Sequence, residues 1–133
     1  MSNKTLFIII GALIVVVAGG AIAYNKKSGG DTVVAGVYDG FAQCLTTNGA
    51  KFYGAFWCSH CQNQKKAFGA SVKYLPYVEC ATPDGQGQTP ACADAKITGY
   101  PTWVFADGQT ASGEQSMEKL AELSKCTLPT VVK

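Results

Sequence analysis

The stretch that most constrains the fold is a pair of cysteines, Cys58 and Cys61, placed where a strand is expected to give way to a helix. An apolar and aromatic run (KFYGAFW, residues 51–57) precedes the pair, and a run with helical character (residues 62–73) follows it. The first turn of a helix has unpaired backbone N–H groups and a partial positive charge. A thiolate at Cys58 would be stabilised there, and the thiolate is the reactive form of cysteine. Cys61, one turn later, is close enough to form a disulfide with Cys58 or to attack a mixed disulfide formed there.

A second motif lies far along the chain, at residues 97–103 (ITGYPTW). The two motifs together resemble the thioredoxin superfamily, in which such a Pro-Thr run carries a cis-proline loop that lies against the Cys-x-x-Cys pair. The longer string YGAFWCSHCQNQKKAFG, with LPYVEC after it, is similar to the thioredoxin-like domain fused to, or working beside, bacterial homologues of vitamin K epoxide reductase. The similarity covers about residues 41–126. It implies that Pro101 shapes the site, and that Trp57 and Tyr100 lie at the groove that receives a client.

Hydrophobic spacing and turn residues predict elements that fit this fold. Helices are expected at residues 38–48, 58–73, 91–96 and 116–125, and strands at residues 51–57, 77–80, 102–106 and 110–113. We therefore expect an α/β, thioredoxin-like domain at residues 38–133, with a central sheet flanked by helices. The glycine-containing polar stretch 25–37 is expected to be a linker.

The N-terminal residues 1–24 are expected to form a single membrane anchor. Residues 6–24 contain no charged side chain, and a membrane span needs about 20 apolar residues. A cleaved signal peptide is the alternative, with residues 21–23 (AIA) as the cleavage site and a secreted product. A buried core helix is a third interpretation. The first two place the domain outside the cytoplasm, as a single-pass protein of the cell membrane or as a secreted one.

Composition restricts the class of partner and the compartment. The chain has 11 basic and 9 acidic residues, and a net charge of +2 gives no case for nucleic-acid binding. Six cysteines in so short a chain favour an oxidising compartment, because cytosolic thiols stay reduced. This agrees with an N-terminal export segment.

The other four cysteines, Cys44, Cys80, Cys92 and Cys126, are expected to be structural. Cys80 and Cys92 flank a turn-rich loop, and the related thioredoxin-like domains carry a cysteine pair at similar positions. A disulfide between them would contribute about 3 kcal/mol in the chain-entropy model. Pairing of Cys44 with Cys126 would tie the two ends of the domain together, although the sequence alone cannot choose among the possible pairings.

Zinc binding is the alternative for the thiols. Cys58, Cys61, Cys80 and Cys92, with His60, supply enough ligands, but the second half lacks the close cysteine pair of a zinc ribbon. The strand, Trp57 and helix around the Cys-x-x-Cys pair fit redox chemistry better. We therefore expect no metal and no cofactor besides a redox-active disulfide.

Three residues bear on the direction of electron flow. His60 is the only histidine, and strongly oxidising members of the superfamily carry His just before the second cysteine. Its ring is expected to stabilise the Cys58 thiolate, the alternative being a solvent-facing side chain without a role. Cytosolic thioredoxins have a buried acid where this chain has Phe52, which weakens the case for a reductase. Glu79, on the neighbouring predicted strand, is a candidate proton acceptor in its place.

These features predict an enzyme: a membrane-tethered, extracytoplasmic thiol–disulfide oxidoreductase. Cys58 would exchange with the cysteines of client proteins, and Cys61 would resolve the mixed disulfide. The resemblance implies reoxidation by a separate quinone-linked, vitamin K epoxide reductase-like membrane protein. The alternatives are a disulfide reductase or isomerase of the same fold, and a binding module in which the Cys58–Cys61 pair is a permanent structural disulfide.

Overall fold

A computed structural model describes residues 36–130 of the chain. Nine helices and strands follow one another along these residues: α2 (Asp39–Thr47), β1 (Lys51–Gly54), α3 (Ser59–Ala67), the 3₁₀ helix η1 (Gly69–Tyr74), β2 (Tyr77–Glu79), α4 (Pro90–Asp94), β3 (Thr102–Val104), β4 (Thr110–Ser112) and α5 (Met117–Ser124). The predicted membrane segment and all but the last two residues of the predicted linker lie outside the described residues. Within residues 36–130, no helix is long and apolar enough to cross a membrane.

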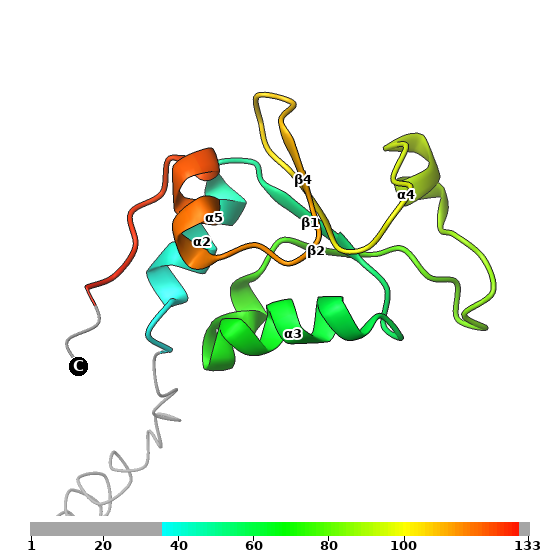
Figure 1. Cartoon of the computed structure of the whole chain (residues 1–133), viewed down its shortest axis with the longest axis horizontal. Helices are drawn as coiled ribbons and strands as arrows, with labels where there is room; N and C mark the ends of the chain where they lie inside the picture. The colour runs from blue at the N-terminus through cyan, green and yellow to red at the C-terminus, as the bar shows by residue number, and fades with distance from the viewer. Residues whose placement is uncertain (1–35, 131–133) are drawn as a thin grey trace, which may run out of the picture. The chain divides into compact units, whose positions relative to one another are not determined.

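The four strands form one mixed sheet in the order β2-β1-β3-β4 (Figure 1). The central strand β1 pairs in parallel with β2 and antiparallel with β3, which in turn pairs antiparallel with β4. Two parallel strands need a long crossover connection, usually a helix, and α3 with η1 supplies it between β1 and β2. The mixed sheet flanked by helices is consistent with the thioredoxin-like fold expected from the sequence.

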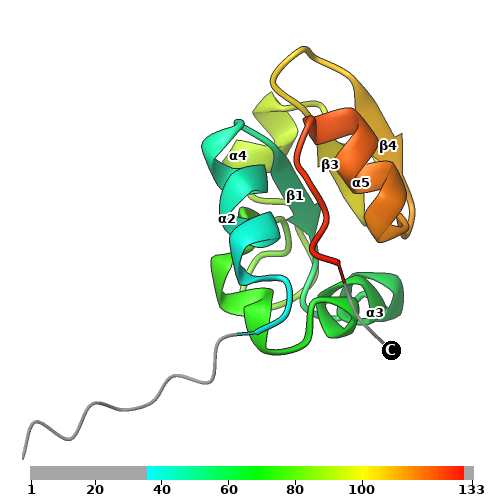
Figure 2. The same cartoon turned by 90° about the vertical axis from the view of Figure 1, so that its left-hand side faces the viewer.

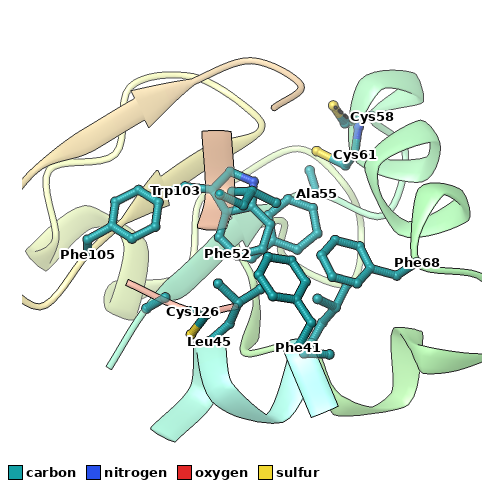
Figure 3. Close-up of a cluster of buried hydrophobic side chains, with 14 of the residues drawn as sticks. Phe41, Leu45, Phe52, Ala55, Cys58, Cys61, Phe68, Trp103, Phe105 and Cys126 are labelled. Atoms are coloured by element: carbon teal, nitrogen blue, oxygen red, sulfur yellow. Dashed lines mark hydrogen bonds between the residues drawn. The ribbon is translucent and has the colours of Figure 1, made fainter. Parts of the chain in front are cut away.

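Aromatic side chains hold the sheet and helices together, and the cysteine pair lies at the edge of this core (Figure 3). Phe52 of β1 stacks on Trp103 of β3 with ring centroids 4.7 Å apart, and both side chains are fully buried. Phe41 of α2 stacks on Phe68, which follows α3. Phe52 thus fills its core position with a large apolar ring.

The prediction of one continuous helix at residues 58–73 is wrong. Helix α3 ends at Ala67, and Gly69 has a φ of +55°, in the left-handed region that an α-helix cannot contain. The chain then continues as η1. The predicted strand at residues 51–57 also ends early, at Gly54, because residues 55–58 form a turn in which the Cys58 N–H donates to the Ala55 carbonyl at 3.0 Å.

A disulfide joins the beginning and the end of the described region. After α5 the chain runs back beside α2 (Figure 2), where Cys126 is bonded to Cys44 across a sequence separation of 82 residues. Asn48, which follows α2, donates to the carbonyl of Ser124 at 2.9 Å. These contacts hold together the two helices that precede and follow the sheet strands.

Candidate active site

Cys58 and Cys61 lie at the start of α3, where the sequence places them. Cys58 is the N-cap residue, and its sulfur accepts a hydrogen bond from the Cys61 N–H at 3.3 Å. Neither forms a disulfide in the structure; Cys58 is 7% exposed and Cys61 is 0% exposed. The N-cap position faces the unpaired N–H groups of the helix, so the Cys58 sulfur lies at the positive end of the helix dipole. The two thiols therefore differ in access: Cys58 reaches the surface and Cys61 does not.

The cis-proline loop borders Cys58 on the other side. The Tyr100–Pro101 peptide bond is cis, and the Cys58 thiol donates to the Tyr100 carbonyl at 3.7 Å. The rings of Tyr100 and Trp57 meet edge to face with centroids 6.0 Å apart. Trp57 is 57% exposed, so an incoming chain that reaches Cys58 would meet an aromatic surface. The structure thus brings together Trp57, Cys58, Cys61, Tyr100 and Pro101, all of which the sequence had nominated.

Cys61 is packed against β1. A β carbon at position 54 would lie 3.0 Å from Cys61 Sγ and 2.8 Å from Tyr77 Cε2, closer than side chains normally approach. Gly54 therefore lets the sulfur and the tyrosine ring pack against the backbone of β1. Burial, followed by the hydrogen bond with Cys58, raises the pKa of the Cys61 thiol to about 12.

Tyr77 and Glu79 on β2 form a polar pair next to this contact. The Tyr77 hydroxyl donates to Glu79 Oε2 at 2.8 Å, while Glu79 Oε1 accepts from the N–H groups of Phe56 at 3.2 Å and Ala81 at 2.9 Å. Lys65 Nζ lies 3.4 Å from the centre of the Tyr77 ring. Burial, together with the bond to Glu79, raises the pKa of Tyr77 above its ordinary value of 10.0. The sequence had suggested Glu79 alone; the alternation of β2, whose residues 77 and 79 share a face, was the signal for Tyr77.

His60 lies on the solvent side of the helix start. Its Nδ1 is 2.6 Å from Glu114 Oε1, and the two side chains are 69% and 40% exposed. The hydrogen bonds from His60 and then Asn63 lower the pKa of the Glu114 carboxyl. The partner described for the His60 ring is thus Glu114 rather than Cys58, and the predicted effect of His60 on Cys58 stays a prediction.

Gln64 determines where Glu114 lies. The Gln64 side chain is 2% exposed, accepts from the Gln115 N–H at 2.7 Å and donates to the Gln115 carbonyl at 3.1 Å. It also accepts from the indole N–H of Trp103 at 3.4 Å. These bonds fix the segment before α5 against α3. No sequence pattern near the cysteines pointed to Glu114, which is more than fifty positions from His60.

The remaining four cysteines form the two disulfides that the sequence analysis favoured. Cys80 is bonded to Cys92, and Cys44 to Cys126. The first bond uses two of the four thiolates that a zinc site would need. Within residues 36–130, no three His, Cys, Asp or Glu side chains lie close enough together to hold a metal ion.

Two thiols of unequal access at a helix start are arranged for thiol–disulfide exchange, the chemistry of the thiol–disulfide oxidoreductases. No protein-family model matches the chain. Over 92 residues, however, the chain is 49% identical to "Thiol-disulfide oxidoreductase LTO1" of Arabidopsis thaliana. The alignment covers 65% of this chain and 24% of that relative, so the chain spans about a quarter of that relative's length. The named class of that relative is the class that the site geometry favours.

Proposed function

We propose that this protein is a thiol–disulfide oxidoreductase in which Cys58 is the nucleophile and Cys61 the resolving thiol. The observation that carries the proposal is that the two sulfurs differ in burial and in position on the helix. Cys58 lies at the N-cap of α3, beside the exposed ring of Trp57, whereas Cys61 is fully buried behind it. Only Cys58 is placed to meet the sulfur of another protein. The 49% identity to a thiol–disulfide oxidoreductase supports the same chemistry.

The direction of exchange is the finer part of the proposal. We propose an oxidant of client cysteines that is tethered to the cell membrane, with the domain outside the cytoplasm. Its support is the uncharged stretch at residues 6–24, the two disulfides of the domain, which persist in oxidising compartments, and Phe52 in place of a buried acid. The proposed partner for reoxidation is a quinone-linked, vitamin K epoxide reductase-like membrane protein, which rests on the sequence resemblance.

A trapping experiment tests the assignment of the two thiols. Cys61→Ser leaves Cys58 free to attack but removes the thiol that resolves the mixed disulfide, so Cys61→Ser should accumulate covalent complexes with client proteins. Non-reducing electrophoresis followed by mass spectrometry measures them. Cys58→Ser is the matched control and should trap none. Equal trapping by both variants would show that Cys58 is not the nucleophile.

The trapping experiment and a measurement of the reduction potential together separate the alternative functions. A binding module with a permanent Cys58–Cys61 disulfide would not react with thiols under mild reduction, and neither variant would trap a client. A reductase or isomerase would trap clients as an oxidant does. It would differ in the reduction potential of the Cys58–Cys61 pair, which equilibrium with glutathione measures.

A further inference from the structure

The buried thiol Cys61 has a proton that must leave when the Cys58–Cys61 disulfide closes. Only the thiolate attacks a disulfide, and with a pKa of about 12 the Cys61 side chain is a thiol at neutral pH. Its side chain is 0% exposed, so bulk water is not in contact with it. The acceptor of the proton is therefore to be sought among the neighbouring side chains.

Few titratable groups face Cys61. They are Cys58 at the helix start, Lys65 one turn further along α3, and Tyr77 of β2 with Glu79 bonded to its hydroxyl. Cys58 is bonded to the sulfur of the reoxidising partner at this stage, and an ammonium or a phenol that holds its proton cannot accept another. The carboxylate of Glu79 is the one group of this set that is able to take up a proton.

The hydrogen bonds of Glu79 leave one oxygen for this purpose. Both backbone N–H groups that it accepts from, those of Phe56 and Ala81, bond to Oε1. Oε2 accepts only the Tyr77 hydroxyl among its described contacts, at 2.8 Å. A β carbon at Gly54 would meet both the Tyr77 ring, at 2.8 Å, and the Cys61 sulfur, at 3.0 Å. Tyr77 therefore packs near the thiol with its ring and bonds to the carboxylate with its hydroxyl.

We propose, on the basis of the proposed function, that Tyr77 and Glu79 together receive the proton of Cys61 as the disulfide closes. The Cys61 thiol gives its proton to the Tyr77 oxygen while the hydroxyl proton of Tyr77 passes to Glu79 Oε2. The Cys61 sulfur then bonds to the Cys58 sulfur, and the bond between Cys58 and the sulfur of the reoxidising partner breaks. Its electron pair leaves with the partner sulfur as a thiolate. Cys61 is oxidised, the partner sulfur is reduced, Glu79 ends protonated, and Tyr77 is unchanged.

Lys65 favours the same step through its charge. Its ammonium lies 3.4 Å from the centre of the Tyr77 ring, and its positive charge lowers the pKa of Cys61 against the larger effect of burial. A cation at this place stabilises the Cys61 thiolate while the thiolate exists. Position 52 of β1 is a buried phenylalanine and has no acid for this step. The polar groups come instead from β2, with Tyr77 and Glu79, and from α3, with Lys65.

A two-step reaction of the reduced full chain with dithiobis-nitrobenzoate tests the proposal. Attack by Cys58 releases one coloured thiolate at a rate proportional to reagent concentration. Attack by Cys61 on the resulting mixed disulfide releases a second at a rate independent of it. Glu79→Gln and Tyr77→Phe should slow the second release by roughly 10²-fold at neutral pH, the usual contribution of a positioned proton acceptor, and leave the first unchanged.

The pH profile separates proton transfer from a merely structural role. In the unaltered protein the second release should vary little with pH above neutrality, because Glu79 accepts the proton. In Glu79→Gln it should rise with pH, because hydroxide must replace the carboxylate. A slower second release with an unchanged pH profile would overturn the proposal, as would no change in rate.

Tyr74→Phe is the matched control for Tyr77→Phe. Tyr74 is also partly buried and also carries a lysine over its ring, Lys73 at 5.0 Å, but it lies in η1 rather than beside Cys61. Its substitution should leave both releases unchanged. Absence of the first release in the unaltered protein would refute the proposed function itself. If the first release is present but the second release has the same pH profile in Glu79→Gln and in the unaltered protein, only the role of Tyr77 and Glu79 is refuted.

Discussion

The two sides of the helix start that carries Cys58 and Cys61 differ in their access to water. On one side, the His60 and Glu114 side chains are 69% and 40% exposed. On the other, Tyr77 and Glu79 are partly buried and Cys61 is fully buried. Solvent screens charges in the first pair, whereas groups withdrawn from water interact with less screening. Closeness in sequence to the cysteines, which had directed attention to His60, therefore does not decide which groups act on them most strongly.

The largest expected effect on the buried side is a loss of stability at high pH that depends on Cys61. Below about pH 9 the thiol is protonated in the folded and the unfolded chain alike. From there to about pH 12 the unfolded chain ionises while the folded chain does not, so the reduced protein loses stability as the pH rises. A difference of three pKa units corresponds to at most about 4 kcal/mol.

Urea unfolding of the protein with Cys58 and Cys61 reduced measures this effect between about pH 8 and about pH 11. The thiol of the unfolded chain begins to ionise within this pH range. Cys61→Ala is the comparison variant, because it removes the thiol and leaves the other titrating groups in place. The free energy of unfolding of the unaltered protein should fall relative to that of Cys61→Ala. Parallel curves for the two proteins would mean that Cys61 is not withdrawn from water.

The next effect in size concerns the glycine at which Cys61 and Tyr77 meet. Gly54→Ala places a methyl group 2.8 Å from the Tyr77 ring and 3.0 Å from Cys61 Sγ, so the neighbours must move. Overpacking of this kind costs about 1–3 kcal/mol. We expect denaturant unfolding of the oxidised full chain to show that loss. Gly40→Ala is the control: Gly40 is exposed in α2, has no atom within 4 Å of the added methyl, and should gain about 0.5–1 kcal/mol. A neutral Gly54→Ala would contradict the close packing.

The elements next to the cysteines were predictable from the sequence because local patterns determine them. The aromatic run before Cys58 predicted a strand, and the turn residues after Cys80 predicted the loop that the Cys80–Cys92 disulfide closes. The break at Gly69 was missed because an isolated glycine is tolerated in a helix, and only its left-handed backbone shows that it ends one.

The surroundings of Cys61 were harder to predict because they depend on strand register. Pairing of Phe52 with Tyr77 and of Gly54 with Glu79 places these β2 side chains on the face of the sheet against which Cys61 packs. A shift of one residue would turn them to the opposite face. Glu114 was equally inaccessible from the sequence, because the buried amide of Gln64, bonded to Gln115, holds it beside His60.

The smallest expected effect is on the exposed side, and it also tests the direction of exchange. We expect the Cys58–Cys61 pair to equilibrate with glutathione at about −180 to −120 mV, nearer disulfide isomerase and DsbA than the about −270 mV of thioredoxin. His60→Ala removes the imidazole from the helix start and should make the disulfide less oxidising. The imidazole is 69% exposed and paired with Glu114, so the shift should be below about 30 mV, a tenfold change in equilibrium constant, and should shrink as salt is added.

Lys119→Ala, which breaks the exposed pair with Glu122 on α5, should leave the potential unchanged. A shift above about 30 mV that persists in high salt would place His60 in effective contact with the Cys58 thiolate and reverse the ranking of the two sides.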